Sequence, residues 1–170
     1  MRNLRFTKIF TIIFICLLFI CVIFNTVLQS QTAPYAVGDN IIRDIKLQTE
    51  LMNIQLDVDK IFRSKPTLLV AAVSTCPHCN HEMDMLQRVY KDYYGLFNII
   101  IALADWNNVE KLRKKYGDTF IYIPITITNL KKVNSVPYNV FADRNGYVVD
   151  THRGALSEKL FVEKIKNIIK

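Results

Sequence analysis

The sequence predicts an α/β domain in which a central mixed β-sheet is flanked by helices. Three observations indicate this class: two continuous apolar runs bounded by turn residues, an amphipathic segment between them, and a hairpin pattern followed by a terminal helix. The chain has 170 residues, of which 51% are hydrophobic, so it has material for one core. We therefore expect one compact domain, at residues 39–170, behind an N-terminal membrane segment.

The two apolar runs are TLLVAAV at residues 67–73 and FNIIIALA at residues 97–104. Because polar residues do not alternate within them, both runs are predicted to be buried central strands. Between them, residues 77–94 carry apolar side chains at spacings of three and four, which predicts an amphipathic helix. This order predicts a βαβ unit.

The other elements have weaker patterns. Two short apolar stretches within residues 41–56 favour a strand pair, and residues 58–62 predict a helical turn. Residues 105–116 predict a second helix. The β-prone residues 120–128 contain Pro124, which favours an edge strand or a loop over a central strand.

The C-terminal part of the chain predicts a hairpin and a helix. PYNVFA and YVVDT are separated by the turn DRNG at residues 143–146, whose Asn-Gly pair tolerates positive φ. Ser157, a residue type that is common at helix N-termini, indicates the start of the last predicted helix, at residues 156–169.

Residues 9–28 form an uncharged apolar segment that is long enough for a helix to cross a bilayer. A cleaved signal peptide is the alternative, but its apolar core is usually shorter, and no clear small-x-small cleavage site follows. We expect a cytoplasmic N-terminus at residues 1–8, a transmembrane signal-anchor in the lipid bilayer at 9–28, and a linker at 29–38.

The net charge of +7 includes Arg2, Arg5 and Lys8, which precede the apolar segment. Under the positive-inside rule these charges place the domain on the extracytoplasmic side of the cell membrane. The rest of the chain has 19 Lys and Arg against 15 Asp and Glu, or +4, without a basic block. This distribution argues against nucleic-acid binding.

Cys76 and Cys79 form a Cys-x-x-Cys motif and are the chain's candidate redox pair. Cys16 and Cys21 lie in the apolar segment, where a thiol acts as a small apolar side chain. The motif follows a predicted strand and opens a helix, and the positive end of a helix stabilises a thiolate. We therefore expect Cys76 to be the sulfur that attacks the partner's disulfide. Cys79, one helical turn later, would resolve the mixed disulfide that forms.

His78 lies between the two cysteines, after Pro77. Its imidazole adds a donor and, when protonated, a charge that favours the thiolate, which would make the pair a better oxidant. The Pro-His dipeptide predicts the oxidising direction.

A metal site is the alternative for a Cys-x-x-Cys motif. Half a zinc site, or a copper-binding metallochaperone using Cys76, Cys79 and a histidine, would fit these residue types. The domain has no third cysteine, and a strand-to-helix junction favours redox chemistry, so we expect no metal and no cofactor beyond the redox-active disulfide. Covalent haem attachment needs a histidine where Asn80 stands.

The chain from about residue 37 to 170 resembles the thioredoxin-like TlpA/ResA group of membrane-anchored thiol–disulfide oxidoreductases. The matching parts, in order, are Val37-Gly38-Asp39, PTLLV at residues 66–70 before the Cys-x-x-Cys motif, Val136-Pro137 before NVFADRNG, and Gly154. The resemblance implies a thioredoxin-like fold. It also implies that Pro137 is a cis-proline packed on the active-site disulfide and that the backbone of Val136 binds the substrate peptide.

In that family a Glu commonly stands six residues after the first Cys, and here it is Glu82. The resemblance implies a carboxylate that tunes the cysteine pKa values and moves a proton. A solvated Glu, stabilised only by the helix dipole, is the alternative.

Some positions depart from the family. Thr75 replaces the usual Trp, and Asp84 replaces a common Pro. The Pro-His dipeptide and the Val before the proline resemble the DsbA oxidases, but the 57 residues between Cys79 and Pro137 leave no room for that family's helical insertion.

The expected function is thiol–disulfide exchange with cysteine-containing exported proteins, and a membrane redox partner resets the Cys76–Cys79 pair. His78 favours an oxidase, whereas the resemblance of the scaffold favours a reductase of apocytochromes or other extracytoplasmic disulfides. Both directions stay open.

Overall fold

The computed structural model describes residues 15–16, 34–93, 95–125 and 132–169. Of the predicted membrane segment only Ile15 and Cys16 are described; both are helical and exposed. In these described ranges no helix is long and apolar enough to cross a membrane.

Five strands form one mixed sheet in the order β3-β2-β1-β4-β5. They are β1 (Thr67–Ala72), β2 (Asn98–Leu103), β3 (Ile121–Pro124), β4 (Tyr138–Ala142) and β5 (Val148–Arg153). β1, β2 and β3 are parallel, β4 runs antiparallel to β1, and β5 runs antiparallel to β4. The predicted mixed sheet is confirmed, and β3 is an edge strand that ends at Pro124, as expected.

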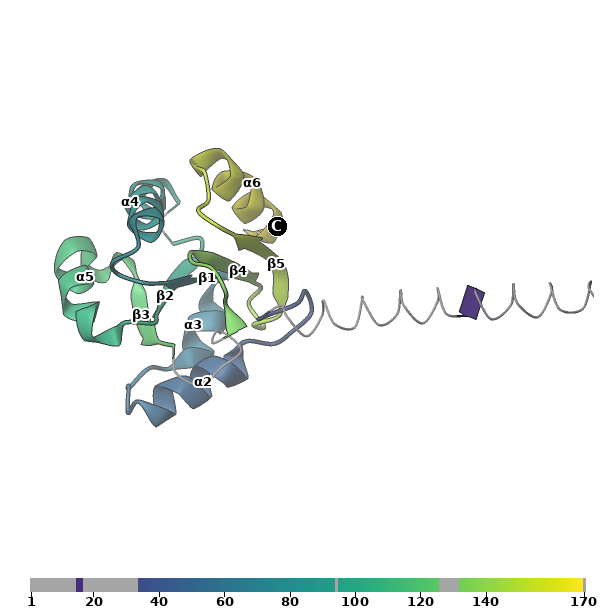
Figure 1. The fold of residues 1–170 in the computed structure, drawn as a ribbon, viewed down its shortest axis with the longest axis horizontal. Coiled ribbons are helices and arrows are strands. Elements are labelled where there is room, and N and C mark those ends of the chain that lie inside the picture. The colour runs from purple at the N-terminus through teal and green to yellow at the C-terminus, as the bar shows by residue number, and fades with distance from the viewer. Residues whose placement is uncertain (1–14, 17–33, 94, 126–131, 170) are drawn as a thin grey trace, which may run out of the picture. The chain divides into compact units, whose positions relative to one another are not determined.

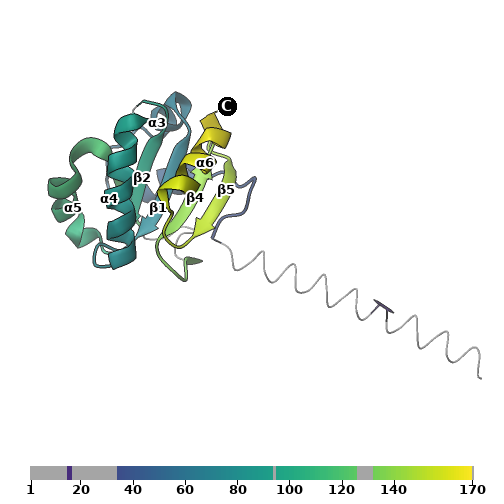
Figure 2. The ribbon, with the colours of Figure 1, turned by 90° about the horizontal axis from the view of Figure 1, so that it is seen from above.

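Helices cover both faces of the sheet (Figure 1). They are α2 (Ile42–Leu51), α3 (Val58–Ser64), α4 (Pro77–Asp92), α5 (Val109–Tyr116) and α6 (Glu158–Ile169), with the short 3-10 turns η1 (Trp106–Asn108) and η2 (Gly117–Thr119) at the two ends of α5. Figure 2 shows α4 and α6 side by side over one face, with α5 beyond α4. The helices α2 and α3 lie on the opposite face (Figure 1).

The sheet buries apolar residues on both faces. In β1, Leu68 and Val70 belong to the core shared with α4 and α6, whereas Leu69 and Ala71 belong to the core shared with α2 and α3. Successive side chains of a strand point to opposite faces, so a strand covered on both sides must be apolar at every position. This explains why the continuous runs correctly predicted β1 and β2.

The predicted strand pair within residues 41–56 is wrong, because most of this segment forms α2. The side chains of Ile41, Ile45 and Gln48 recur at spacings of four and three and are buried. Two buried positions of α2, Gln48 and Thr49, are polar, so the apolar period was incomplete in the sequence. The tertiary contact with the sheet selected the helix.

The C-terminal hairpin and helix are confirmed. Gly146 has a φ of 78°, and its N–H donates to the Asp143 carbonyl at 3.0 Å, which closes the turn between β4 and β5. Ser157 Oγ accepts a hydrogen bond from the N–H of Leu160 at 3.3 Å at the start of α6.

Candidate active site

The cysteine pair lies at the junction predicted from the sequence. Cys76 is the N-cap of α4, and its Sγ accepts a hydrogen bond from the N–H of Cys79 at 3.4 Å. Pro77 occupies the first turn, where no backbone donor is required. Both cysteines are free thiols in this structure. The Cys76 sulfur therefore lies at the N-terminal end of α4, where it accepts a hydrogen bond from the helix backbone.

The two thiols differ in environment. Cys76 is partly exposed, whereas only 1% of Cys79 is exposed. Burial raises the pKa of the Cys79 thiol to about 12, and the neighbouring Cys76 sulfur and Glu82 carboxylate add to the rise. Cys79 is therefore a neutral thiol at physiological pH, and Cys76 is the sulfur that a partner can reach.

The Val136-Pro137 peptide bond is cis, as the resemblance implied. Pro137 is buried, and the Val136 carbonyl oxygen lies 4.0 Å from Cys76 Sγ. The loop before β4 therefore borders the attacking sulfur, although Val136 lies 60 residues from Cys76 in the chain.

A cavity of about 370 Å³ adjoins this loop. Its lining residues come from the carboxyl ends of β1, β2 and β3 and from the loop before Pro137, and are Val73, Ala104, Ile125, Val133, Asn134, Ser135 and Val136. Most of them are apolar, so the cavity can receive apolar side chains next to the sulfur of Cys76.

Glu82 is fully buried, with 0% of its surface exposed, so the alternative of a solvated Glu is wrong. Burial raises its pKa to about 8, and the nearby Asn139 side chain and Leu156 N–H offset only part of that rise. Neither carboxyl oxygen accepts a hydrogen bond of ordinary geometry. At pH 7 Glu82 is therefore mainly a neutral acid, one helical turn beyond Cys79.

Asp105 and Ser74 form a link that the sequence analysis missed. Asp105 Oδ1 accepts a hydrogen bond from the Ser74 N–H at 2.9 Å, and its Oδ2 accepts one from the Ser74 hydroxyl. Burial opposes ionisation of Asp105, but these hydrogen bonds and one from Asn108 hold its pKa below the ordinary value. The loop that leads into Cys76 is thereby tied to the end of β2.

The position of Asp105 in the chain was a usable signal. Asp105 closely follows β2, and Ser74 closely follows β1. Because the carboxyl ends of neighbouring parallel strands meet at one edge of a sheet, the two residues were bound to lie close together.

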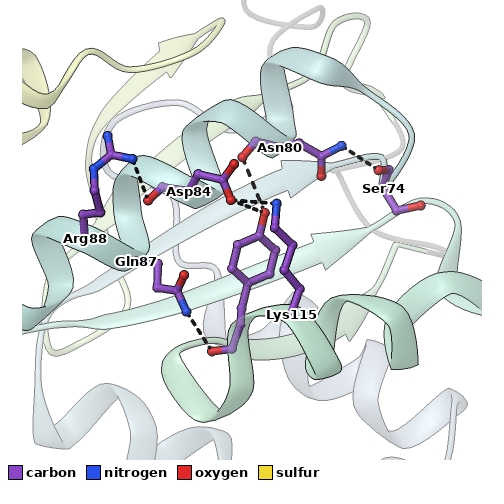
Figure 3. Close-up of polar contacts among 7 residues, drawn as sticks. Ser74, Asn80, Asp84, Gln87, Arg88 and Lys115 are labelled. Carbon is purple, nitrogen blue, oxygen red and sulfur yellow. Dashed lines mark hydrogen bonds and ion pairs between the residues drawn. The ribbon is translucent and has the colours of Figure 1, made fainter.

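The helix α4 holds the same loop from its other side. Asn80 Nδ2 donates a hydrogen bond to the Ser74 carbonyl at 2.9 Å (Figure 3). Farther along the helix, Asp84 accepts a hydrogen bond from the Tyr116 hydroxyl at 2.9 Å and pairs with Lys115 Nζ at 2.7 Å. These contacts join α5 to α4, so Asp84, which departs from the family pattern, has a structural contact here.

The histidines near the motif lie at the surface. His78 and His81 are exposed, and the contacts of the described residues include no hydrogen bond from His78 to Cys76 Sγ. His152 lies on β5 opposite Asn139. Among the residues that the structure describes, no group of three or more His, Cys, Asp or Glu side chains could hold a metal ion.

The fold is similar to solved structures of thiol–disulfide proteins. A thiol-disulfide isomerase from Corynebacterium glutamicum superposes with a TM-score of 0.60 at 13% identity, covering 68% of this chain and 87% of that protein. A thiol:disulfide interchange protein of the thioredoxin family from Chlorobium tepidum gives 0.54 at 19% identity, covering 64% and 83%. StoA from Bacillus subtilis gives 0.50 at 18% identity, covering 61% and 83%.

Neither a protein-family model nor a curated protein sequence matches the chain. The structural similarity therefore establishes the fold, which is thioredoxin-like, with the Cys-x-x-Cys motif at the start of α4.

Proposed function

We propose that the chain is a membrane-anchored thiol–disulfide oxidoreductase that exchanges disulfides with cysteine-containing exported proteins. The observation that carries the proposal is the asymmetry of the two thiols at the N-terminus of α4. Cys76 is partly exposed at the helix cap, and Cys79 is buried behind it with a raised pKa. The similar structures named as a thiol-disulfide isomerase and a thiol:disulfide interchange protein support the same reaction class.

In the reducing direction, the Cys76 thiolate attacks one sulfur of a client disulfide. A mixed disulfide forms, and one client thiolate leaves. Cys79 then loses its proton and attacks Cys76 Sγ, which releases the second client thiolate and leaves a Cys76–Cys79 disulfide. The oxidising direction is the reverse of these steps. Two electrons pass between client and pair, and a membrane dithiol–disulfide partner resets the pair.

Glu82 is the proton acceptor for the resolving step. The Cys79 thiol has a pKa of about 12, so it needs a nearby base before it can attack. Glu82 has a pKa of about 8, so roughly one molecule in ten carries the ionised form at pH 7. In the reverse direction the protonated Glu82 returns the proton to Cys79.

The client binds as an extended segment along the loop before β4. Support comes from the Val136 carbonyl group beside Cys76 Sγ and from the apolar cavity that adjoins it. An apolar residue close to the client cysteine would fill this cavity.

The direction of exchange and the location of the protein are proposed from the sequence alone. His78 favours the oxidising direction, and the apolar segment at residues 9–28 anchors the domain outside the cytoplasm. Both stay predictions. For the anchor, the full chain should remain with membranes after a high-salt wash, and deletion of residues 1–33 should release it.

The reaction is tested with Cys79→Ala, which lacks the resolving thiol. This variant should accumulate client proteins as mixed disulfides on Cys76, visible on non-reducing gels and released by dithiothreitol. The matched control is the Cys76→Ser, Cys79→Ala double variant, which should trap none. If the wild-type protein neither reduces insulin disulfides nor oxidises a dithiol peptide, and Cys79→Ala traps no client, the proposed function is wrong.

A further inference from the structure

Asn139 lies on β4 and has no role in the predictions made from the sequence. We propose that Asn139 is a positioning residue for Glu82: its side-chain amide, held by Gly154, keeps the buried carboxyl group in place beside Cys79. This inference rests on the proposed function, because it assigns Asn139 to the proton transfer of that site.

Asn139 and Glu82 are both buried polar residues, with 0% of their surfaces exposed. The register places Asn139 between Val70 of β1 and His152 of β5, in the middle of the sheet. A buried amide in such a place costs stability unless it is hydrogen-bonded, so its presence needs a compensating polar partner.

Asn139 Nδ2 donates a hydrogen bond to the Gly154 carbonyl at 3.2 Å, and the amide lies close enough to the Glu82 carboxyl group to lower its pKa. Asn139 Oδ1 and both carboxyl oxygens of Glu82 have no hydrogen-bond partner of ordinary geometry, so these buried polar groups are available to one another. An amide offers both a donor and an acceptor, so it can hold the carboxyl group in either state: Oδ1 accepts from the protonated acid, and Nδ2 donates to the carboxylate.

Gly154 connects this contact to the loop before β4, along which the client is proposed to bind. Its N–H donates to the Pro137 carbonyl at 2.9 Å, and its own carbonyl accepts from Asn139. The φ of Gly154 is 89°, a conformation that glycine adopts without strain. The same residue therefore holds the cis-proline loop and the amide that contacts Glu82.

Other titratable groups surround this contact. Cys76 and Cys79 face it from α4, and His152 lies on the same face of the sheet as its register partner Asn139. An ion pair between β5 and α6 joins Asp150 and Lys164. A test must therefore follow Glu82 itself.

Glu82 can be followed by NMR of protein labelled with ¹³C at the glutamate side-chain carboxyl carbon, in the reduced state. The signal that disappears in the Glu82→Gln variant is thereby assigned to Glu82. In Asn139→Leu the donor to the carboxylate is gone, so the midpoint of the Glu82 titration should move up by about one pH unit. The control Thr67→Val removes a buried hydroxyl group at the far end of β1 and should leave the midpoint unchanged.

Asn139→Ser also removes the amide but is smaller, and it decides the result if Asn139→Leu does not fold. An unchanged midpoint in a folded Asn139 variant overturns the proposal. The midpoint is measured without turnover, so it is independent of the proposed function, which fails only if the wild-type protein does not exchange disulfides.

Discussion

Cys79 and Glu82 lie one helical turn apart on the buried face of α4, with 1% and 0% of their surfaces exposed. Burial is the main cause of the raised pKa of each group, and the ionised Glu82 raises the pKa of Cys79 further. Once Glu82 is ionised, it therefore makes it harder for Cys79 to lose its proton. The burial of Glu82 gives the site a titration near pH 8 that an exposed Cys-x-x-Cys pair would lack.

Glu82→Gln should slow the resolving step, because Gln cannot accept the proton of Cys79. The expected loss is about 100-fold in the rate at which a Cys76 mixed disulfide resolves, together with loss of the titration near pH 8. The rate is measured by stopped flow with a fluorescent disulfide peptide between pH 6 and 9. Glu50→Gln, at an exposed position on α2, should keep the wild-type profile, and a wild-type profile in Glu82→Gln would refute the proton-transfer role.

The stability of the protein should decrease as the pH rises. Folding raises the pKa of Glu82 from 4.5 to about 8, so within that interval the folded state holds a proton that the unfolded state has released. The free energy of unfolding should fall by on the order of 4 kcal/mol between pH 5 and pH 8.5. Urea denaturation of wild type and Glu82→Gln checks this: the variant should lose most of the slope, and equal slopes would contradict the prediction.

Asp105→Ala should loosen the loop that carries Cys76, because Ser74 loses the acceptor for both its N–H and its hydroxyl group. We expect a loss of about 1–3 kcal/mol in the free energy of unfolding at pH 7, and exchange that is several-fold slower. The pKa of Asp105 is lowered, so its contribution is present above about pH 4 and lost as the pH falls through the folded-state pKa. Asp118→Ala, exposed in η2, is the matched control and should be near neutral.

His78→Ala tests the direction of electron flow. If the imidazole favours the Cys76 thiolate, its removal should make the reduction potential of the pair more negative by about 30 mV. The potential is measured by equilibration with glutathione buffers, with His152→Ala as a control on β5. An unchanged potential would show that the exposed His78 does not tune the pair, and a strongly reducing wild-type value would contradict the oxidase prediction.

Several features of the site were predictable because they depend on short stretches of chain. The Cys-x-x-Cys motif follows an apolar run and opens an amphipathic segment, so the placement of Cys76 at the cap of α4 could be read from neighbouring residues. The hairpin before α6 was equally local, since Asp143 and Gly146 close its turn. The cis bond before Pro137 was expected from the family resemblance alone and is present in the structure.

The wrong strand pair and the missed site residues have one physical cause: they depend on packing between segments that are far apart in the sequence. The segment that forms α2 has a polar residue, Gln48, on its buried face, so its period did not show the helix. The burial of Glu82 and its contact with Asn139 depend on how α4 packs on β4, two elements far apart in sequence.

The sequence by itself determined the class of fold, the two central strands and the cysteine pair at a helix N-terminus, because hydrophobic period and turn chemistry are local properties. Only the tertiary structure decided that Glu82 is a buried acid rather than a solvated one, and that Asn139 of β4 is buried near it. The pKa of a carboxyl group depends on the solvent and dipoles around it, and these are set by packing between distant segments.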